Sequence, residues 1–193
     1  MSCDIHQNKD YWEIRHLMRC YPATELQIKG ILHTLESSRE KTDSSDFLNG
    51  FPWEHTNWYS CQLEYSNVES LFLFWDGTAW GESLDKPPRR LDEGASCFIR
   101  ITSDPIQSNN THLKRIKYWL KKYEAGEILN SEHFLILAGL NENSPLLILD
   151  GNHRLSAAMW WAIKKRDLSE LPRMAWIGFS NEMKNYMFYA RIT

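Results

Sequence analysis

The sequence predicts an α+β protein in which a small mixed sheet has flanking helices and follows an N-terminal helical and aromatic-rich extension. Two observations carry this prediction. Apolar runs of strand length occur at 133–138, 146–149 and 174–179. Between the last two runs, apolar residues recur at helical spacing from Leu155 to Ile163. Strand-like and helix-like segments that alternate in this way are typical of a mixed sheet covered by helices.

The composition supports a globular chain. The 193 residues are 42% hydrophobic and 24% charged, which is enough to bury a core and excludes a disordered chain. A net charge of -3 does not signal nucleic-acid binding, although local basic patches leave it possible. We see no apolar run long enough for a membrane span and no signal peptide, so we expect a cytoplasmic protein that binds no membrane.

The four cysteines carry no metal-binding or redox spacing. They lie far apart in the chain, so we expect them to be reduced and to serve in packing. They are Cys3, Cys20, Cys61 and Cys97. His16, His33, His55, His112 and His133 likewise show no partner spacing, and each is interpreted as a surface histidine or one satisfied within the core.

Residues 1–90 form the predicted extension. The apolar residues Ile14, Leu17 and Met18 predict a first helix. Thr24 and Gln27 have the spacing of a capping box at the start of a second one. The polar stretch 37–46 predicts a loop, and residues 71–75 predict the clearest strand of an aromatic-rich region. The pair of prolines at 87 and 88 marks the domain boundary.

Residues 91–193 form the predicted main domain. Residues 97–101 predict a short strand, and 112–124 a helix with Leu113, Ile116, Leu120 and Tyr123 turned inward. The runs at 133–138 and 146–149 predict neighbouring strands around a turn-rich connection. The helix from Leu155, a strand at 174–179 and a closing helix at 181–190 complete the domain.

The chemistry is concentrated where the strand at 146–149 meets the following helix. The intervening residues Asp150, Gly151, Asn152, His153 and Arg154 place backbone N–H groups and the helix dipole at a sheet edge, where an anion is favoured. Gly151 allows close approach of a ligand. Arg154 could hold two phosphate oxygens, and His153 could donate a hydrogen bond or move a proton. Asp150 could cap the helix, bind a metal ion or orient His153.

Energetics require further groups at such a site. A helix N-terminus supplies about 0.3–1 kcal/mol, or up to roughly 2 when partly buried. Micromolar binding requires about 8 kcal/mol. Charge-assisted hydrogen bonds of about 1.5–3 kcal/mol each, together with an aromatic ring under a base, would close the gap. The candidate cations are Arg89, Arg90, Arg100, Lys114, Lys117 and Lys121.

The strand-DGNHR-helix segment resembles the signature of the ParB/sulfiredoxin superfamily, whose members include partition CTPases, free-serine kinases and DGQHR proteins. The resemblance covers residues 95–180 and is concentrated in 146–158. It implies a ParB/sulfiredoxin-like fold that seats nucleotide phosphates on Gly151, Asn152, His153 and Arg154. ATP or CTP with Mg²⁺ would be the cofactors, and a small molecule or protein the acceptor.

Departures from the family pattern narrow the reaction. Sulfiredoxin chemistry needs a cysteine in the turn, where this chain has Asn152. Few residues follow Arg154, which disfavours a partition protein with a further DNA-binding region. Kinase-like members use an acidic general base near an early strand, and Asp104 is the positional candidate here.

These observations predict an NTP-dependent phosphotransferase or NTPase. Arg154 and the turn would hold phosphates, His153 would stabilise charge or relay a proton, and Asp104 or Asp150 would act as base, with Asp150 also a candidate metal ligand. The alternative is a non-catalytic nucleotide sensor or interaction module in phage-host conflict or DNA metabolism. A nuclease ranks last because the sequence shows no carboxylate cluster.

Overall fold

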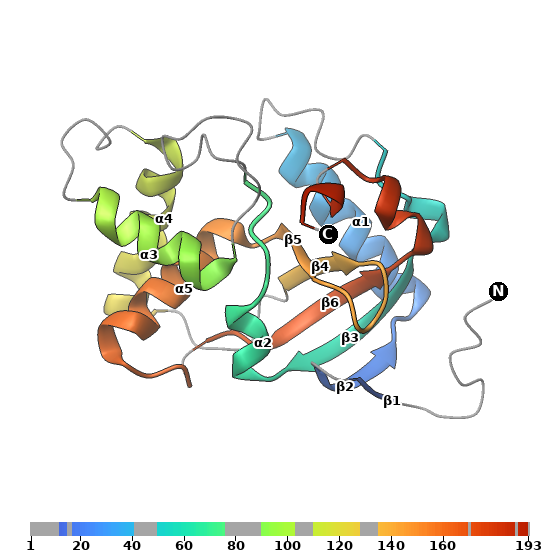
Figure 1. The fold of residues 1–193 in the computed structure, drawn as a ribbon, viewed down its shortest axis with the longest axis horizontal. Coiled ribbons are helices and arrows are strands. Elements are labelled where there is room, and N and C mark those ends of the chain that lie inside the picture. The colour runs from blue at the N-terminus through green and yellow to red at the C-terminus, as the bar shows by residue number, and fades with distance from the viewer. Residues whose placement is uncertain are drawn as a thin grey trace.

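A computed structural model describes residues 12–14, 17–40, 50–75, 90–102, 110–127, 135–169, 171–187 and 189–192. Within these residues the chain is a mixed α/β protein built on one six-stranded sheet with flanking helices (Figure 1). The mixed sheet and the flanking helices therefore agree with the predicted fold class.

The strands are β1 (Trp12–Ile14), β2 (Leu17–Pro22), β3 (Asn57–Leu63), β4 (Leu135–Gly139), β5 (Leu147–Asp150) and β6 (Met174–Phe179), in the order β1-β2-β3-β6-β4-β5. β4 and β6 are parallel, and every other neighbouring pair is antiparallel. Three of these strands precede residue 90 and three follow it, so the sheet takes strands from both predicted segments.

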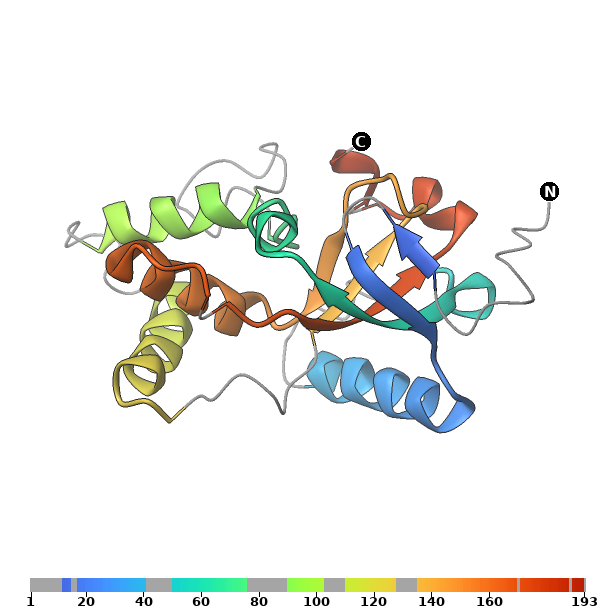
Figure 2. The same cartoon turned by 90° about the horizontal axis from the view of Figure 1, so that it is seen from below.

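The α-helices are α1 (Glu25–Glu40), α2 (Tyr65–Glu69), α3 (Leu91–Ile101), α4 (Thr111–Glu124) and α5 (Asn152–Lys165). Short 3₁₀ helices lie at η2 (Trp53–His55), η5 (Asn181–Asn185) and η6 (Tyr189–Arg191). Both views show α3, α4 and α5 grouped at one end of the sheet and α1 apart from them (Figures 1 and 2). α5 contacts both α3 and α4, which makes it the centre of the group.

Two apolar cores lie on opposite faces of the sheet. Because side chains alternate along a strand, Leu135 and Leu137 of β4 join one cluster and Ile136 and Ala138 the other. The first cluster includes the buried faces of α3, α4 and α5, and the second includes that of α1 and the C-terminal 3₁₀ helices. The helix group is thus anchored to the sheet through the face of Leu135.

Several predicted elements are confirmed. Thr24 and Gln27 form the capping box, since the Thr24 N–H donates to Gln27 Oε1 at 2.8 Å and the Gln27 N–H to Thr24 Oγ1 at 3.3 Å. α4 buries the four residues predicted to face inward. β4, β5, α5 and β6 also occur where the periodicity predicts them.

Other predictions are wrong. The predicted first helix is the β1–β2 pair, because pairing with β3 at the sheet edge outweighs a weak helical spacing. The predicted strand 97–101 belongs to α3, since a short apolar run fits a buried helix equally well. The predicted strand at 71–75 is absent, since these residues make only isolated bridges through Phe72. The predicted closing helix at 181–190 is replaced by two short 3₁₀ helices. The start of the predicted loop 37–46 belongs to α1, while 41–46 lie outside the described residues.

The expectation of reduced cysteines is wrong for one pair. Cys20 and Cys61 are joined by a disulfide, because the β2–β3 register places them directly opposite each other. The two cysteines are 41 residues apart in the chain, so their spacing does not predict this pairing. Cys97 is a free, buried cysteine, and Cys3 lies outside the described residues.

Candidate functional site

The turn between β5 and α5 requires a glycine. Gly151 has a φ of +98°, a conformation that a side chain disfavours. A β-carbon there would lie 3.0 Å from Leu135 Cδ2 and 3.3 Å from Arg154 Nη2. The Leu155 N–H donates to the Gly151 carbonyl at 2.8 Å, which starts the helix. Gly151 therefore ends a buried strand, opens α5 and lies against the Arg154 guanidinium.

The Asn152 side chain has a structural role. Its Oδ1 accepts a hydrogen bond from the Phe74 N–H at 3.0 Å, and its Nδ2 donates to the Ile148 carbonyl at 3.1 Å. The residue is only 8% exposed. Its amide thus joins the α5 turn to residues 71–75, and Asn152 can offer a ligand mainly its backbone N–H.

His153 is one of a pair of histidines. Its Nε2 lies 3.1 Å from His112 Nδ1, and the two rings stack with their centroids 5.2 Å apart. Trp75 contacts both imidazoles at a centroid distance of 4.6 Å. Burial, with smaller contributions from His112 and Arg115, lowers the pKa of His153 to about 3. At neutral pH both the desolvation and these charges hold the His153 ring neutral.

The guanidinium of Arg154 is the cation of the turn. Burial lowers the pKa of Arg154, while the Asp150 carboxylate and the Tyr123 phenol act in the opposite direction. The charge of Arg154 is therefore partly desolvated and attracted to Asp150. An anion at the turn would meet a guanidinium already held in place by its surroundings.

Asp150 is half-buried at the end of β5 and attracts Arg154 electrostatically. Among the described residues, no group of three or more His, Cys, Asp or Glu side chains could hold a metal ion. Mg²⁺ often binds one or two carboxylates together with substrate phosphates. Asp150 therefore fits a Mg²⁺ site only if phosphate oxygens complete the coordination.

The other candidate residues either have contacts elsewhere or lie outside the described residues. Asp104, the candidate base, and Arg89 lie outside the described residues. Arg90 forms an ion pair with Asp92, and Arg100 Nη2 lies 3.4 Å from Cys97 Sγ. The three lysines of the predicted basic stripe belong to α4, which turns Leu113, Ile116, Leu120 and Tyr123 into the core instead.

Sequence reasoning missed the neighbours of His153. The sequence shows no partner spacing for His112, and it presents Trp75 as one of many aromatic residues. They come from α4 and from the segment before α3, so no sequence spacing links either of them to residue 153. Only the packing of α4 against α5 brings the two histidines together.

Comparison of the chain with models of known protein families, with curated proteins and with solved structures finds no match. Within the described residues, no helix has the length and apolar character to cross a membrane.

Proposed function

We propose that the chain is a nucleotide-binding enzyme of ParB/sulfiredoxin-like fold that transfers or hydrolyses the terminal phosphate of a nucleoside triphosphate. The observation that carries the proposal is the turn at Gly151, where a left-handed glycine opens a helix directly beneath the Arg154 guanidinium. Helix N-termini attract anions, and a guanidinium can bind two phosphate oxygens in the same plane.

Each residue of the turn has a distinct role in this proposal. The backbone of Gly151, Asn152 and His153 would bind phosphate oxygens, and Arg154 would neutralise their charge. Asp150 would hold Mg²⁺ together with those oxygens, and the ion would stabilise negative charge on the phosphates. Asp104 would act as the base, and Asp150, which lies among the described residues, is the alternative.

The geometry of His153 favours proton relay over charge stabilisation. A ring whose pKa is lowered to about 3 carries no charge at neutral pH. With His112 Nδ1 at 3.1 Å, one ring donates a hydrogen bond and the other accepts it. A proton could therefore enter the His153 ring at one nitrogen as the other nitrogen releases its proton to His112, so that His153 need not stay charged. Arg154 would supply the positive charge.

A non-catalytic nucleotide sensor is the second candidate. The hydrogen bond from the Phe74 N–H to Asn152 Oδ1 favours it, because this bond would pass a movement of the turn to residues 71–75. Binding without turnover, coupled to dimerisation, is the outcome that distinguishes a sensor from an enzyme.

The test is calorimetric titration of the full chain with ATP, CTP, GTP and ADP, with and without Mg²⁺, followed by analysis of the recovered nucleotide. We expect Arg154→Ala to weaken binding by about 10- to 100-fold or more, the loss of a charge-assisted hydrogen bond. Lys165→Ala, which removes an exposed cation at the other end of α5, is the matched control. Equal affinity of wild type and Arg154→Ala would refute the assignment.

A further inference from the structure

A pocket of about 330 Å³ lies at the end of β5 opposite to Gly151. It is lined by Leu146, just before β5, by Phe179 at the end of β6, and by Leu71 and Phe72. β4 and β6 are parallel, so the pocket lies near the carboxyl ends of both strands. Ligands of open α/β sheets commonly bind at such edges. The walls formed by these four side chains are apolar.

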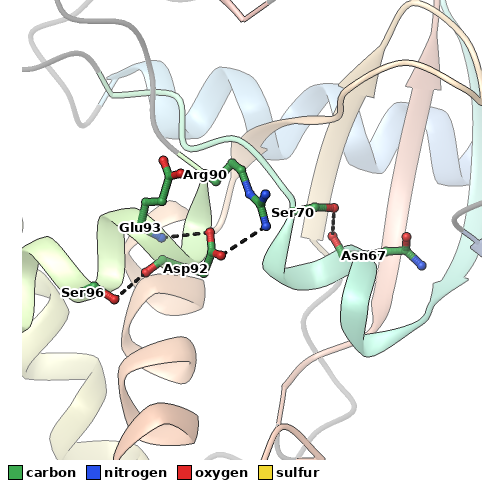
Figure 3. A network of polar contacts seen from close by, with 6 residues as sticks. All are labelled: Asn67, Ser70, Arg90, Asp92, Glu93 and Ser96. Atoms are coloured by element: carbon green, nitrogen blue, oxygen red, sulfur yellow. Dashed lines mark hydrogen bonds and ion pairs between the residues drawn. The ribbon is translucent and has the colours of Figure 1, made fainter.

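Arg90 brings an unsatisfied donor to the pocket. Its Nη2 donates to Asp92 Oδ2 at 3.1 Å, whereas its Nε is buried and has no hydrogen-bond partner among the described residues. Figure 3 shows Arg90 between the start of α3 and the end of α2, with Asp92 on one side and Ser70 on the other. A buried donor left unpaired is costly, so an acceptor atom in the pocket would stabilise this arrangement.

Asn67 presents a second polar group in the same pocket. The residue is 5% exposed, and its backbone carbonyl accepts a hydrogen bond from Ser70 Oγ at 2.9 Å (Figure 3). Its side-chain amide makes no hydrogen bond to any residue that the structure describes. Asn67 therefore adds a second polar side chain to the lining of the pocket, in addition to Arg90.

The charges around the pocket limit what the ligand can be. Asp92 already offsets part of the Arg90 charge, and Glu142 contributes a half-buried carboxylate to the lining. A doubly charged phosphate would be repelled by these two acids. A single carboxylate can accept hydrogen bonds from Arg90 with less repulsion, and an apolar body would fill the space beside Phe72 and Phe179.

We propose that this pocket is a binding site for a small apolar monocarboxylate, whose carboxylate is bound by the Arg90 guanidinium and whose body packs on Phe72 and Phe179. The site is distinct from the nucleotide turn. Leu146 and Gly151 are five positions apart along an extended strand, roughly 16 Å at 3.3 Å per residue. The proposal therefore stands or fails independently of the proposed function.

The experiment uses the full chain and ¹H–¹⁵N NMR titration with phenylacetate. Phenylacetamide, which has the same shape without the charge, and inorganic phosphate are the comparison probes. We expect phenylacetate to shift the amide signals of residues 70–72 and 142–146 and to bind more tightly than either comparison probe. Equal binding of phenylacetamide, shifts confined to residues 151–154, or no binding by a series of monocarboxylates of increasing apolar size would each overturn the proposal.

Three substitutions sharpen the test because they should change the affinity for phenylacetate in opposite directions. Arg90→Met keeps the length of the side chain and removes its donors, so phenylacetate should bind about 10- to 100-fold more weakly. Glu142→Gln and Asp92→Asn each remove a neighbouring negative charge and should tighten binding by several-fold. Asp92→Asn also weakens the Arg90 ion pair while retaining Arg90, which separates that loss from the loss of the donor.

The sign of the Glu142→Gln effect also identifies a competing ligand class. If the ligand were a zwitterion whose ammonium group pairs with Glu142, this substitution would weaken binding. Such a result with phenylalanine as the probe, together with no binding of phenylacetate, would overturn the assignment to a monocarboxylate.

Discussion

The two ends of β5 differ in how their polar side chains are satisfied. At the Gly151 end, Asn152 makes two hydrogen bonds and His153 is paired with His112. At the Leu146 end, Arg90 Nε and the Asn67 amide have no partners among the described residues. The polar side chains at the Gly151 end are held by contacts within the protein, whereas the Leu146 end includes Arg90, which the sequence offers only as one of several candidate cations.

The two ends of β5 therefore differ in what they could offer a ligand. The turn offers a fixed backbone, and most of its side-chain hydrogen bonds are made before any ligand arrives. The pocket offers the buried, unpaired Nε of Arg90, whose desolvation cost a ligand would offset. Substitutions at the first end should therefore change stability strongly, and substitutions at the second should change binding more than stability.

The largest effect is expected for Gly151→Ala. An alanine at position 151 would be strained by the positive φ, and its β-carbon would be crowded by Leu135 and Arg154. We therefore expect a loss of about 3 kcal/mol in the free energy of unfolding. Gly126 has a φ of +69° with open space around it, so Gly126→Ala should cost about 1–2 kcal/mol. Urea unfolding of both variants measures the difference. Equal losses would mean that the crowding at Gly151 is absent.

The next largest effect compares two buried asparagines. Asn152→Ala removes the hydrogen bonds that Asn152 makes to the Phe74 N–H and the Ile148 carbonyl and should destabilise the protein by about 2 kcal/mol. Asn67→Ala removes no side-chain hydrogen bond and should cost less than about 1 kcal/mol. Urea unfolding of the two variants tests the contrast between the ends of β5 directly, and a larger cost for Asn67→Ala would reverse it.

The effect that is smallest at neutral pH, because it develops only on acidification, is a pH dependence. Since the pKa of His153 is about 3 in the folded chain and 6.5 ordinarily, the unfolded chain binds a proton between these values that the folded chain does not. The contribution of His153 to the free energy of unfolding is therefore complete above about pH 6.5. It is lost as the pH falls, by at most about 1.4 kcal/mol per pH unit. His153→Asn removes this contribution, so its stability difference from wild type should narrow on acidification.

Measurement of unfolding free energy across pH 7 to pH 4, with an NMR titration of the imidazole, checks this expectation. His112→Asn provides the matched variant, because loss of the His112 charge should raise the pKa of His153 in part, while burial continues to lower it. A stability gap between wild type and His153→Asn that widens toward low pH would contradict the environment described for His153.

Local patterns were sufficient to predict α4, β5, α5 and the turn between β5 and α5. The reason is that apolar periodicity and glycine chemistry act over a few neighbouring residues. The same reasoning failed for Cys97–Ile101 and for the N-terminal strands, where a short apolar run or a weak spacing fits both structures. There the burial of α3 and the pairing of β2 with β3 decided the outcome.

Neighbouring residues in the chain could establish that Gly151 opens a helix beside Arg154, because all of that geometry is local. Only the tertiary structure could bring His112 and Trp75 to His153, Cys20 to Cys61, and Asn67 and Arg90 into one pocket. Each of these contacts joins separate elements through sheet register or helix packing. Such contacts have no period in the sequence, since they arise from the way distant elements bury their apolar faces together.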